Sequence, residues 1–220
     1  IPLRDNIPSV RRPWALYVLI AANLAAFLLS RTLDQARLDM LFHILGVVPA
    51  RFADPAWAAA AGYPGWGAVS MVTYMFLHGS WLHLGFNLWT LWVFADNVED
   101  VMGPLRFVLF YLCCGLAALT THYVFNLHDT QPVIGASGAI AAVLGAYFVL
   151  YPRARVVVLI WFFFFVNFVR VPAVAVLGIW FLFQVLGLGG EGVAWMAHIG
   201  GFVAGMALVR LFLPRTSGLR

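Results

Sequence analysis

The stretch Gly135-Ala136-Ser137-Gly138 opens one apolar run of the chain, and Ala197-His198-Ile199-Gly200-Gly201 lies inside another. Nucleophilic and ionisable side chains are costly to place in hydrocarbon, so their presence there indicates function. Ser137 and His198 are therefore the first candidates for a functional site. The small residues beside them allow a second backbone to approach closely.

Composition indicates a membrane protein. The chain of 220 residues is 63% hydrophobic and 10% charged, with a mean hydropathy of +0.91. A typical globular domain is about half apolar and about a quarter charged. The 13 basic residues are all arginine and are scattered over segment ends, which argues against a nucleic-acid partner. Cys113 and Cys114 are adjacent, so we expect them to pack rather than to form a disulfide framework.

Six apolar runs approach the roughly 20 residues that a membrane span needs. They are Trp14–Ser30, Trp81–Val98, Leu105–Phe125, Ser137–Tyr151, Val171–Leu188 and Val193–Leu213. A further run, Val156–Val169, is short for a span, and we expect it to lie in the interface or re-enter it. The connection 31–80 carries Phe42, Trp57 and Trp66, aromatic residues that favour the headgroup level, so it is predicted to lie in the membrane surface.

These runs predict an all-α membrane protein with six transmembrane helices and a long membrane-surface loop between the first two. The expected divisions are a cytoplasmic segment 1–13, a membrane domain 14–213 and a cytoplasmic tail 214–220. Arginines at positions 4, 11, 12, 106, 153, 155, 215 and 220 outnumber those on the opposite side. The positive-inside rule therefore places both termini in the cytoplasm.

This topology brings the polar residues to one depth. His83 and Asn87, four apart on the second run, share one helix face near its outer end. Ser137 begins the fourth run and His198 lies early in the sixth. If Val156–Val169 crossed the membrane, the sixth run would be inverted and His198 would move to the inner side.

Three motifs of the chain occur in an order that can be compared with known families. His78-x4-His83-x3-Asn87, then Gly135-Ala136-Ser137-Gly138, then Ala197-His198 with Gly201 and Gly205, resemble the rhomboid intramembrane serine proteases. The opening Ile1-Pro2-Leu3-Arg4-Asp5 resembles bacterial members. The resemblance implies that Ser137 is the nucleophile and His198 the base. His83, Asn87 and the Ser137 backbone N–H would form the oxyanion hole, and His78, Gly135, Gly138, Gly201 and Gly205 would support it.

The expected function is that of an intramembrane serine endopeptidase, which cuts transmembrane protein substrates in the lipid bilayer near their extracytoplasmic end. The expected location is a bacterial inner membrane. No cofactor or metal is implied. A neutral histidine is needed as base, so activity should rise through a pKa near 6 to 7.

Two places depart from the family pattern. Better-known members carry an aromatic residue four positions after the serine, stacked on the catalytic histidine, and here that position is Ala141. The orientation of His198 must therefore come from elsewhere. The Trp-Arg or Glu-Arg pair common in the first long loop is also missing between positions 31 and 80.

Other interpretations compete with a serine protease. Gly-x-Ser-Gly alone is usually a packing or capping motif, and His83 with Asn87 alone could hold helices together. A metalloprotease would want His-Glu-x2-His, which the chain lacks. A silent rhomboid-like protein that escorts membrane segments would typically lose the serine or the histidine. A transporter would carry ionisable groups deeper in its spans. Asp96, Glu99 and Asp100 are interpreted as solvated charges, and His122 as interfacial.

Overall fold

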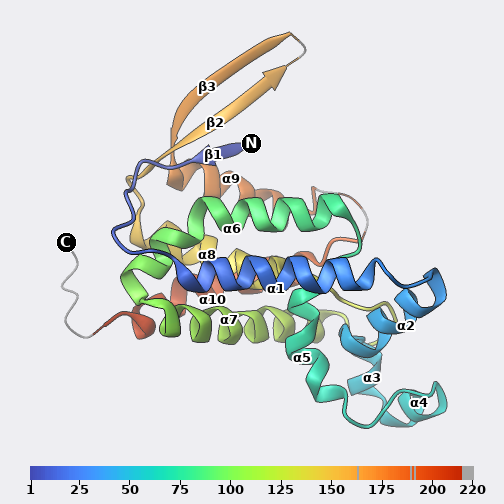
Figure 1. The fold of residues 1–220 in the computed structure, drawn as a ribbon. Helices are drawn as coiled ribbons and strands as arrows, with labels where there is room; N and C mark the ends of the chain where they lie inside the picture. The colour runs from blue at the N-terminus through green and yellow to red at the C-terminus, as the bar shows by residue number, and fades with distance from the viewer. Residues whose placement is uncertain (163, 189, 191, 215–220) are drawn as a thin grey trace.

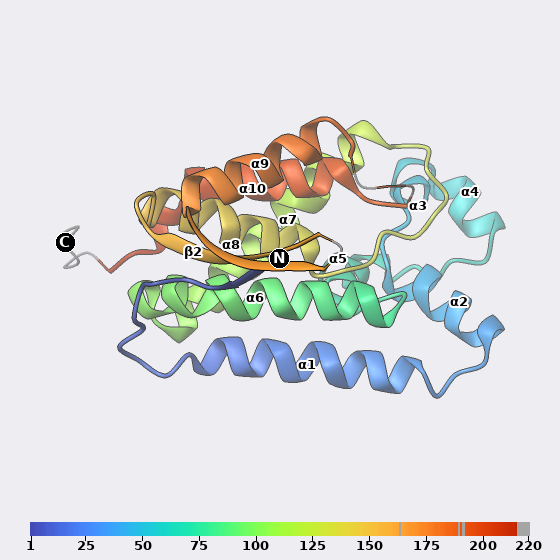
Figure 2. The ribbon, with the colours of Figure 1, turned by 90° about the horizontal axis from the view of Figure 1, so that it is seen from above.

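The computed structural model describes residues 1–220 except 163, 189, 191 and 215–220. Each of the six long apolar runs forms a helix, and the six helices lie side by side with roughly aligned axes (Figures 1 and 2). They are α1 (Trp14–Ser30), α6 (Trp81–Met102), α7 (Pro104–Phe125), α8 (Ser137–Leu150), α9 (Ala173–Val185) and α10 (Trp195–Phe212). By length and composition, α7 and α10 could cross a membrane, whereas α1, α8 and α9 are apolar but shorter.

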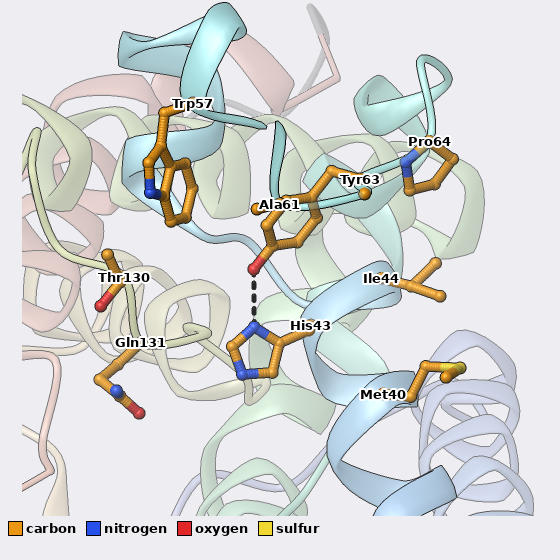
Figure 3. A pocket seen from close by; sticks show the side chains of 10 residues that line it. Met40, His43, Ile44, Trp57, Ala61, Tyr63, Pro64, Thr130 and Gln131 are labelled. Atoms are coloured by element: carbon orange, nitrogen blue, oxygen red, sulfur yellow. Dashed lines mark hydrogen bonds between the residues drawn. The ribbon is translucent and has the colours of Figure 1, made fainter. Parts of the chain in front are cut away.

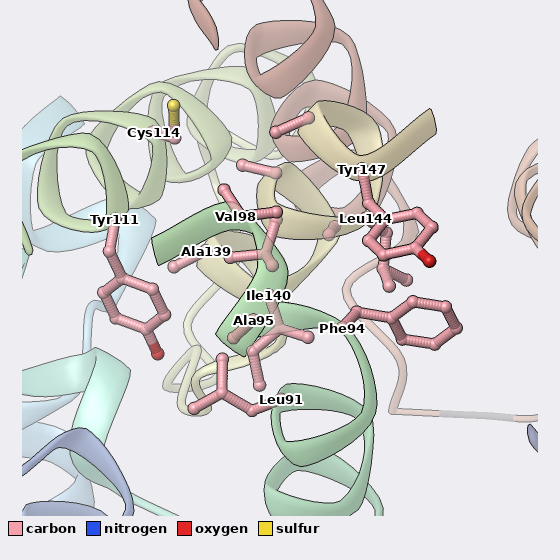
Figure 4. Close-up of a cluster of buried hydrophobic side chains, with 14 of the residues drawn as sticks. Leu91, Phe94, Ala95, Val98, Tyr111, Cys114, Ala139, Ile140, Leu144 and Tyr147 are labelled. Carbon is pink, nitrogen blue, oxygen red and sulfur yellow. The ribbon is translucent and has the colours of Figure 1, made fainter. Parts of the chain in front are cut away.

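Helix α8 forms the centre of the bundle. Every residue from Gly138 to Tyr147 is buried. Apolar side chains of α6 and α7 pack around it. Figure 4 shows Leu91, Phe94, Ala95, Val98, Tyr111 and Cys114 of these helices together with Ala139, Ile140, Leu144 and Tyr147 of α8. A helix of 14 residues is only about 21 Å long. Because protein surrounds it, its short length is no obstacle to a central position.

Helix α10 packs directly on the backbone of α8. A Cβ on Gly201 would overlap the carbonyl oxygen of Gly138, and one on Gly205 would overlap that of Ala142. From the other side, a Cβ on Gly145 would overlap the carbonyl oxygen of Phe202. Glycine at these positions removes the side chains that would otherwise hold the two helices apart.

The connection between α1 and α6 is itself mostly helical. It contains α2 (Gln35–Leu45), α3 (Pro49–Ala53), α4 (Pro55–Ala60), η1 (Gly67–Val69), α5 (Ser70–Thr73) and η2 (Tyr74–Phe76). Its short helices gather at one end of the bundle (Figure 1). Asp34 caps α2 by accepting the backbone N–H of Arg37 at 2.9 Å. The placement of this connection in the membrane surface remains a prediction.

The prediction of an all-α fold is wrong in one region. Val156–Val169 falls within a β-hairpin of β2 (Arg155–Phe162) and β3 (Phe165–Pro172), and β1 (Pro2–Arg4) adds a third strand in the order β1-β2-β3. All pairs are antiparallel. The run was too short for a span, and its valines and aromatics favour strands. Figure 2 shows the sheet between α6 and α9, over α8.

The N-terminal segment is tied to the bundle rather than free. The Trp89 indole donates to the Pro2 carbonyl at 2.6 Å, and the Arg155 backbone N–H donates to Asn6 at 2.6 Å. Glu99 is 2% exposed and accepts the backbone N–H groups of Ala15 and Leu16. The interpretation of Glu99 as a solvated charge is therefore wrong, because this carboxylate caps α1.

Candidate active site

Ser137 and His198 meet where α8 and α10 begin. Ser137 is the first residue of α8, and His198 lies in the first turn of α10. The distance from Ser137 Oγ to His198 Nε2 is 2.8 Å, a hydrogen bond between a hydroxyl and a ring nitrogen. The glycine contacts between the helices bring these two side chains together, although they are 61 positions apart in sequence.

The other ring nitrogen of His198 also has a partner, which the sequence reading missed. His198 Nδ1 lies 2.6 Å from Oε1 of Gln184, in the last turn of α9. The ring lies beside two indoles, with centroid distances of 6.1 Å to Trp180 and 6.3 Å to Trp195. The available signal was a lone amide in an otherwise apolar run, but its proximity to His198 depends on how α9 packs.

Ala141 could not carry the aromatic residue of the family pattern in this arrangement. Its side chain is fully buried, and a Cβ on Gly201 would already lie 3.2 Å from the Ala141 Cβ. A ring at position 141 would collide with α10. The indoles of Trp180 and Trp195 reach the histidine instead, from α9 and from α10 itself.

His83 approaches Ser137 from the first turns of α6. Gly135 has a φ of 127°, which disfavours a side chain, and a Cβ there would lie 2.7 Å from His83 Nε2 and 3.6 Å from Ser137 Oγ. Glycine at 135 thus leaves space for the His83 ring against the backbone just before the serine. Gly138 is similarly confined, since its Cβ would be 2.9 Å from that of Ala118.

Asn87 is held by His78. The Asn87 side-chain nitrogen lies 2.9 Å from His78 Nε2, so one amide hydrogen is committed to this ring. His78 is 1% exposed and stacks edge-on against His83, with ring centroids 4.8 Å apart. Burial, with the neighbouring His83, lowers the pKa of His78 to about 4. His78 therefore stays neutral at pH 7 and can accept the Asn87 N–H.

His83, Asn87, Ser137 and His198 line one cavity. A volume of about 770 Å³ is lined by polar groups from α6, α7, the connection after α7, α8 and α10, namely His83, Asn87, His122, Asn126, Asp129, Gln131, Ser137 and His198. His122, interpreted as interfacial, is 7% exposed and lines the cavity, and its depth in the membrane stays a prediction. No hydrogen-bond partner for either of its ring nitrogens is found among the described residues.

A second cavity, of about 460 Å³, lies between the connection that joins α1 to α6 and residues Thr130 and Gln131 of the segment between α7 and α8 (Figure 3). Its polar pair is His43 Nδ1 and the Tyr63 hydroxyl, 2.7 Å apart. Burial raises the pKa of Tyr63, although the nearby Arg51 acts in the opposite direction. A phenol kept protonated is a poor nucleophile, so the cavity of Ser137 and His198 is the stronger candidate for catalysis.

Part of this chain is similar in sequence to known rhomboid proteins. The chain is 32% identical to rhomboid protease GluP of Bacillus subtilis over 148 residues, which are 66% of this chain and 26% of that protein. It is 32% identical over 91 residues to the mitochondrial presenilin-associated rhomboid-like protein of Mus musculus (40% of this chain, 24% of that protein). The match to mitochondrial rhomboid protein 1 of Saccharomyces cerevisiae is 29% over 96 residues, 42% of this chain and 28% of that protein.

The matched regions thus span only about a quarter of these relatives. The family model described as the Rhomboid domain matches residues 65–215, which contain all six helices except α1 and every residue of the candidate site. A bundle with this site geometry, matched over most of its length, makes this chain a member of the membrane-embedded rhomboid family.

Proposed function

We propose that this protein is an intramembrane serine endopeptidase that uses Ser137 and His198 to cut transmembrane segments of other proteins. The observation that carries the proposal is the 2.8 Å hydrogen bond between Ser137 Oγ and His198 Nε2 at the edge of a polar-lined cavity. A serine hydroxyl becomes an effective nucleophile when an adjacent base takes its proton. The resemblance to rhomboid protease GluP is consistent with this chemistry.

The reaction would proceed in two halves. Ser137 Oγ attacks the peptide carbonyl carbon while its proton passes to His198 Nε2. The C–N bond then breaks, and the proton moves from Nε2 to the leaving nitrogen. Water hydrolyses the acyl-serine ester in the second half, with His198 again taking and returning a proton. Two covalent steps of this kind replace one difficult hydrolysis.

The oxyanion formed in each half needs hydrogen-bond donors. The Ser137 backbone N–H lies at the start of α8, where no helical carbonyl is available to it. His83, pressed against Gly135, and the Asn87 amide line the same cavity. Fixed donors of this kind act strongly where water is excluded. We assign the oxyanion hole to these three groups, with His78 holding Asn87.

The sheet supports the proposed topology of six spans. Because β1 pairs with β2, the chain must cross the membrane an even number of times between them. The helices α1, α6, α7 and α8 supply four crossings. With the termini in the cytoplasm, as the arginine distribution indicates, the site lies near the outer face, and the cut falls near the extracytoplasmic end of the substrate. Small residues around Ser137 favour a small residue before the cut.

Labelling and cleavage together test this proposal. The purified protein in liposomes should react with a fluorophosphonate at Ser137 and cut a model single-span substrate of known orientation, with EDTA present throughout. Ser137→Ala should lose both activities. Thr120→Ala, which removes an exposed hydroxyl from α7, is the matched control and should keep both. A folded protein that binds the substrate without labelling or cleavage would instead be a silent, escorting rhomboid.

A further inference from the structure

Gln184 is a polar group buried among apolar helices. It is 8% exposed, in the last turn of α9, a helix whose other twelve residues are apolar. A buried amide costs free energy unless its hydrogen bonds are made. Gln184 makes two: Oε1 lies 2.6 Å from His198 Nδ1, and Nε2 donates to the Trp180 carbonyl at 3.3 Å.

These two hydrogen bonds determine which group donates and which accepts between Gln184 and His198. Since Nε2 of Gln184 faces a carbonyl, its oxygen must face His198, and an amide oxygen can only accept. His198 Nδ1 therefore carries the hydrogen. Nε2 of the ring is left with its lone pair, 2.8 Å from Ser137 Oγ. This is the tautomer that a base toward serine requires.

The ring has few other means of fixing its tautomer. The indoles of Trp180 and Trp195 contact its faces and edge but offer Nδ1 no acceptor in the described contacts. The other titratable groups that act on His198 are His83 of α6 and His122 of α7, and neither is an acidic residue. The position where the family pattern places an orienting aromatic is occupied by Ala141.

We propose that Gln184 is a positioning residue for the reaction, in a Ser137–His198–Gln184 relay, and this rests on the proposed hydrolytic function. Gln184 does not touch the substrate. It holds the hydrogen on Nδ1, and keeps that bond when Nε2 takes the serine proton. In serine proteases with a carboxylate at this position, replacing it so that the wrong tautomer forms lowers kcat about 10⁴-fold. A neutral amide acceptor should contribute less.

Two variants of nearly equal size test the role. Gln184→Met preserves volume but offers only a weak acceptor, and should lower kcat by about 10- to 100-fold while KM changes less than threefold. Gln184→Glu retains an acceptor and adds a negative charge beside the imidazole. That charge favours the protonated ring, so the acid limb of the kcat profile should move to higher pH, with activity recovered at alkaline pH. Leu182→Ala, on an exposed part of α9, is the control and should match the parent.

The pH profile tests the contact between Gln184 and His198, and the kcat of Gln184→Met tests its role. A side chain at position 184 that does not face the His198 ring would leave the acid limb unmoved in Gln184→Glu, and that result would overturn the proposal even if Gln184→Met failed to fold. Parent-like kcat in a folded Gln184→Met variant would overturn it too. If the parent neither labels at Ser137 nor cleaves, the proposed function itself fails, which is a separate outcome read from the parent alone.

Discussion

Helices α8 and α9 of the same bundle differ in how far they are buried. All residues of α8 from Gly138 to Tyr147 are buried, whereas α9 buries only Ala173, Leu177 and Gln184. The proposed nucleophile Ser137 starts the enclosed helix, and Gln184, which contacts the proposed base His198, comes from the peripheral one. The difference shows that one site can combine two kinds of support. Backbone contacts between α8 and α10 place Ser137 and His198, and a side chain of the less buried α9 contacts the His198 ring.

The largest effect should come from Ser137 and His198, the pair joined where α8 and α10 begin. Ser137→Ala and His198→Ala should each lower turnover by at least about 10⁴-fold, since each removes one half of the proton transfer. The double variant should be no worse than either single one, because the two side chains act as a unit. Initial rates of substrate cleavage in liposomes provide the measurement. Near-parental turnover in either folded single variant would show that the dyad is misassigned.

A smaller effect is expected from the proposed oxyanion donors on α6. Asn87→Ala should lower kcat by roughly 10²-fold, the scale for losing one donor, with little change in KM. Steady-state kinetics on a peptide with a transmembrane segment measures both. His83→Ala should behave similarly. If kcat were unchanged in Asn87→Ala, the amide would serve only to hold His78.

One glycine of α10 at its contact with α8 and one glycine of α9 sharpen the comparison. Gly205→Ala places a Cβ against the carbonyl oxygen of Ala142 and should destabilise the fold by about 1–3 kcal/mol. Gly178 of α9 has nothing within 4 Å of such a Cβ. Gly178→Ala should be neutral or raise stability by up to about 1 kcal/mol, because alanine favours helix. Unfolding midpoints in detergent check both, and equal midpoints would contradict the contrast.

The smallest effect expected is a loss of fold stability at acid pH that depends on His78. Its pKa of about 4 in the fold lies below the ordinary 6.5, so the unfolded chain takes up a proton first as pH falls. The contribution to stability is full above pH 6.5 and is lost as pH falls from 6.5 to 4. His78→Gln, whose amide oxygen can still accept from Asn87, should reduce the drop in unfolding midpoint between pH 7.5 and 5.

Asp5 supplies a control of opposite sign. Burial raises the pKa of Asp5, which also accepts a hydrogen bond from Tyr147. A raised carboxyl pKa stabilises the fold as pH falls toward it. Asp5→Asn removes that gain and should deepen the acid loss that His78→Gln reduces. Equal acid losses in the parent and both variants would show that neither group governs this pH range.

The six helices were predictable because length and hydropathy are local properties of each run. The first run, Trp14–Ser30, is helical over the same residues, and the other ends coincide with helix ends or differ from them by a few positions. The hairpin was missed because an apolar run of this length does not distinguish a strand from a short helix. β1 has three residues and gains its partner only from β2.

Some residues of the candidate site could likewise be predicted from the sequence, and others could not. Ser137, His198, His83 and Asn87 could be named from motifs and spacing, and the structure brings them to one cavity. Gln184, Trp180 and His122 could not, because no short spacing links them to His198. Their proximity arises from the packing of α7, α9 and α10.

The pairing of β1 with β2 has a consequence for synthesis. The first strand leaves the ribosome before α1, and its partner follows only after α8 has been made. Pairings between such distant segments must wait for the intervening chain. Protection of residues 2–4 from hydrogen exchange during translation would therefore mark the moment when the fourth long helix is in place and the hairpin has emerged.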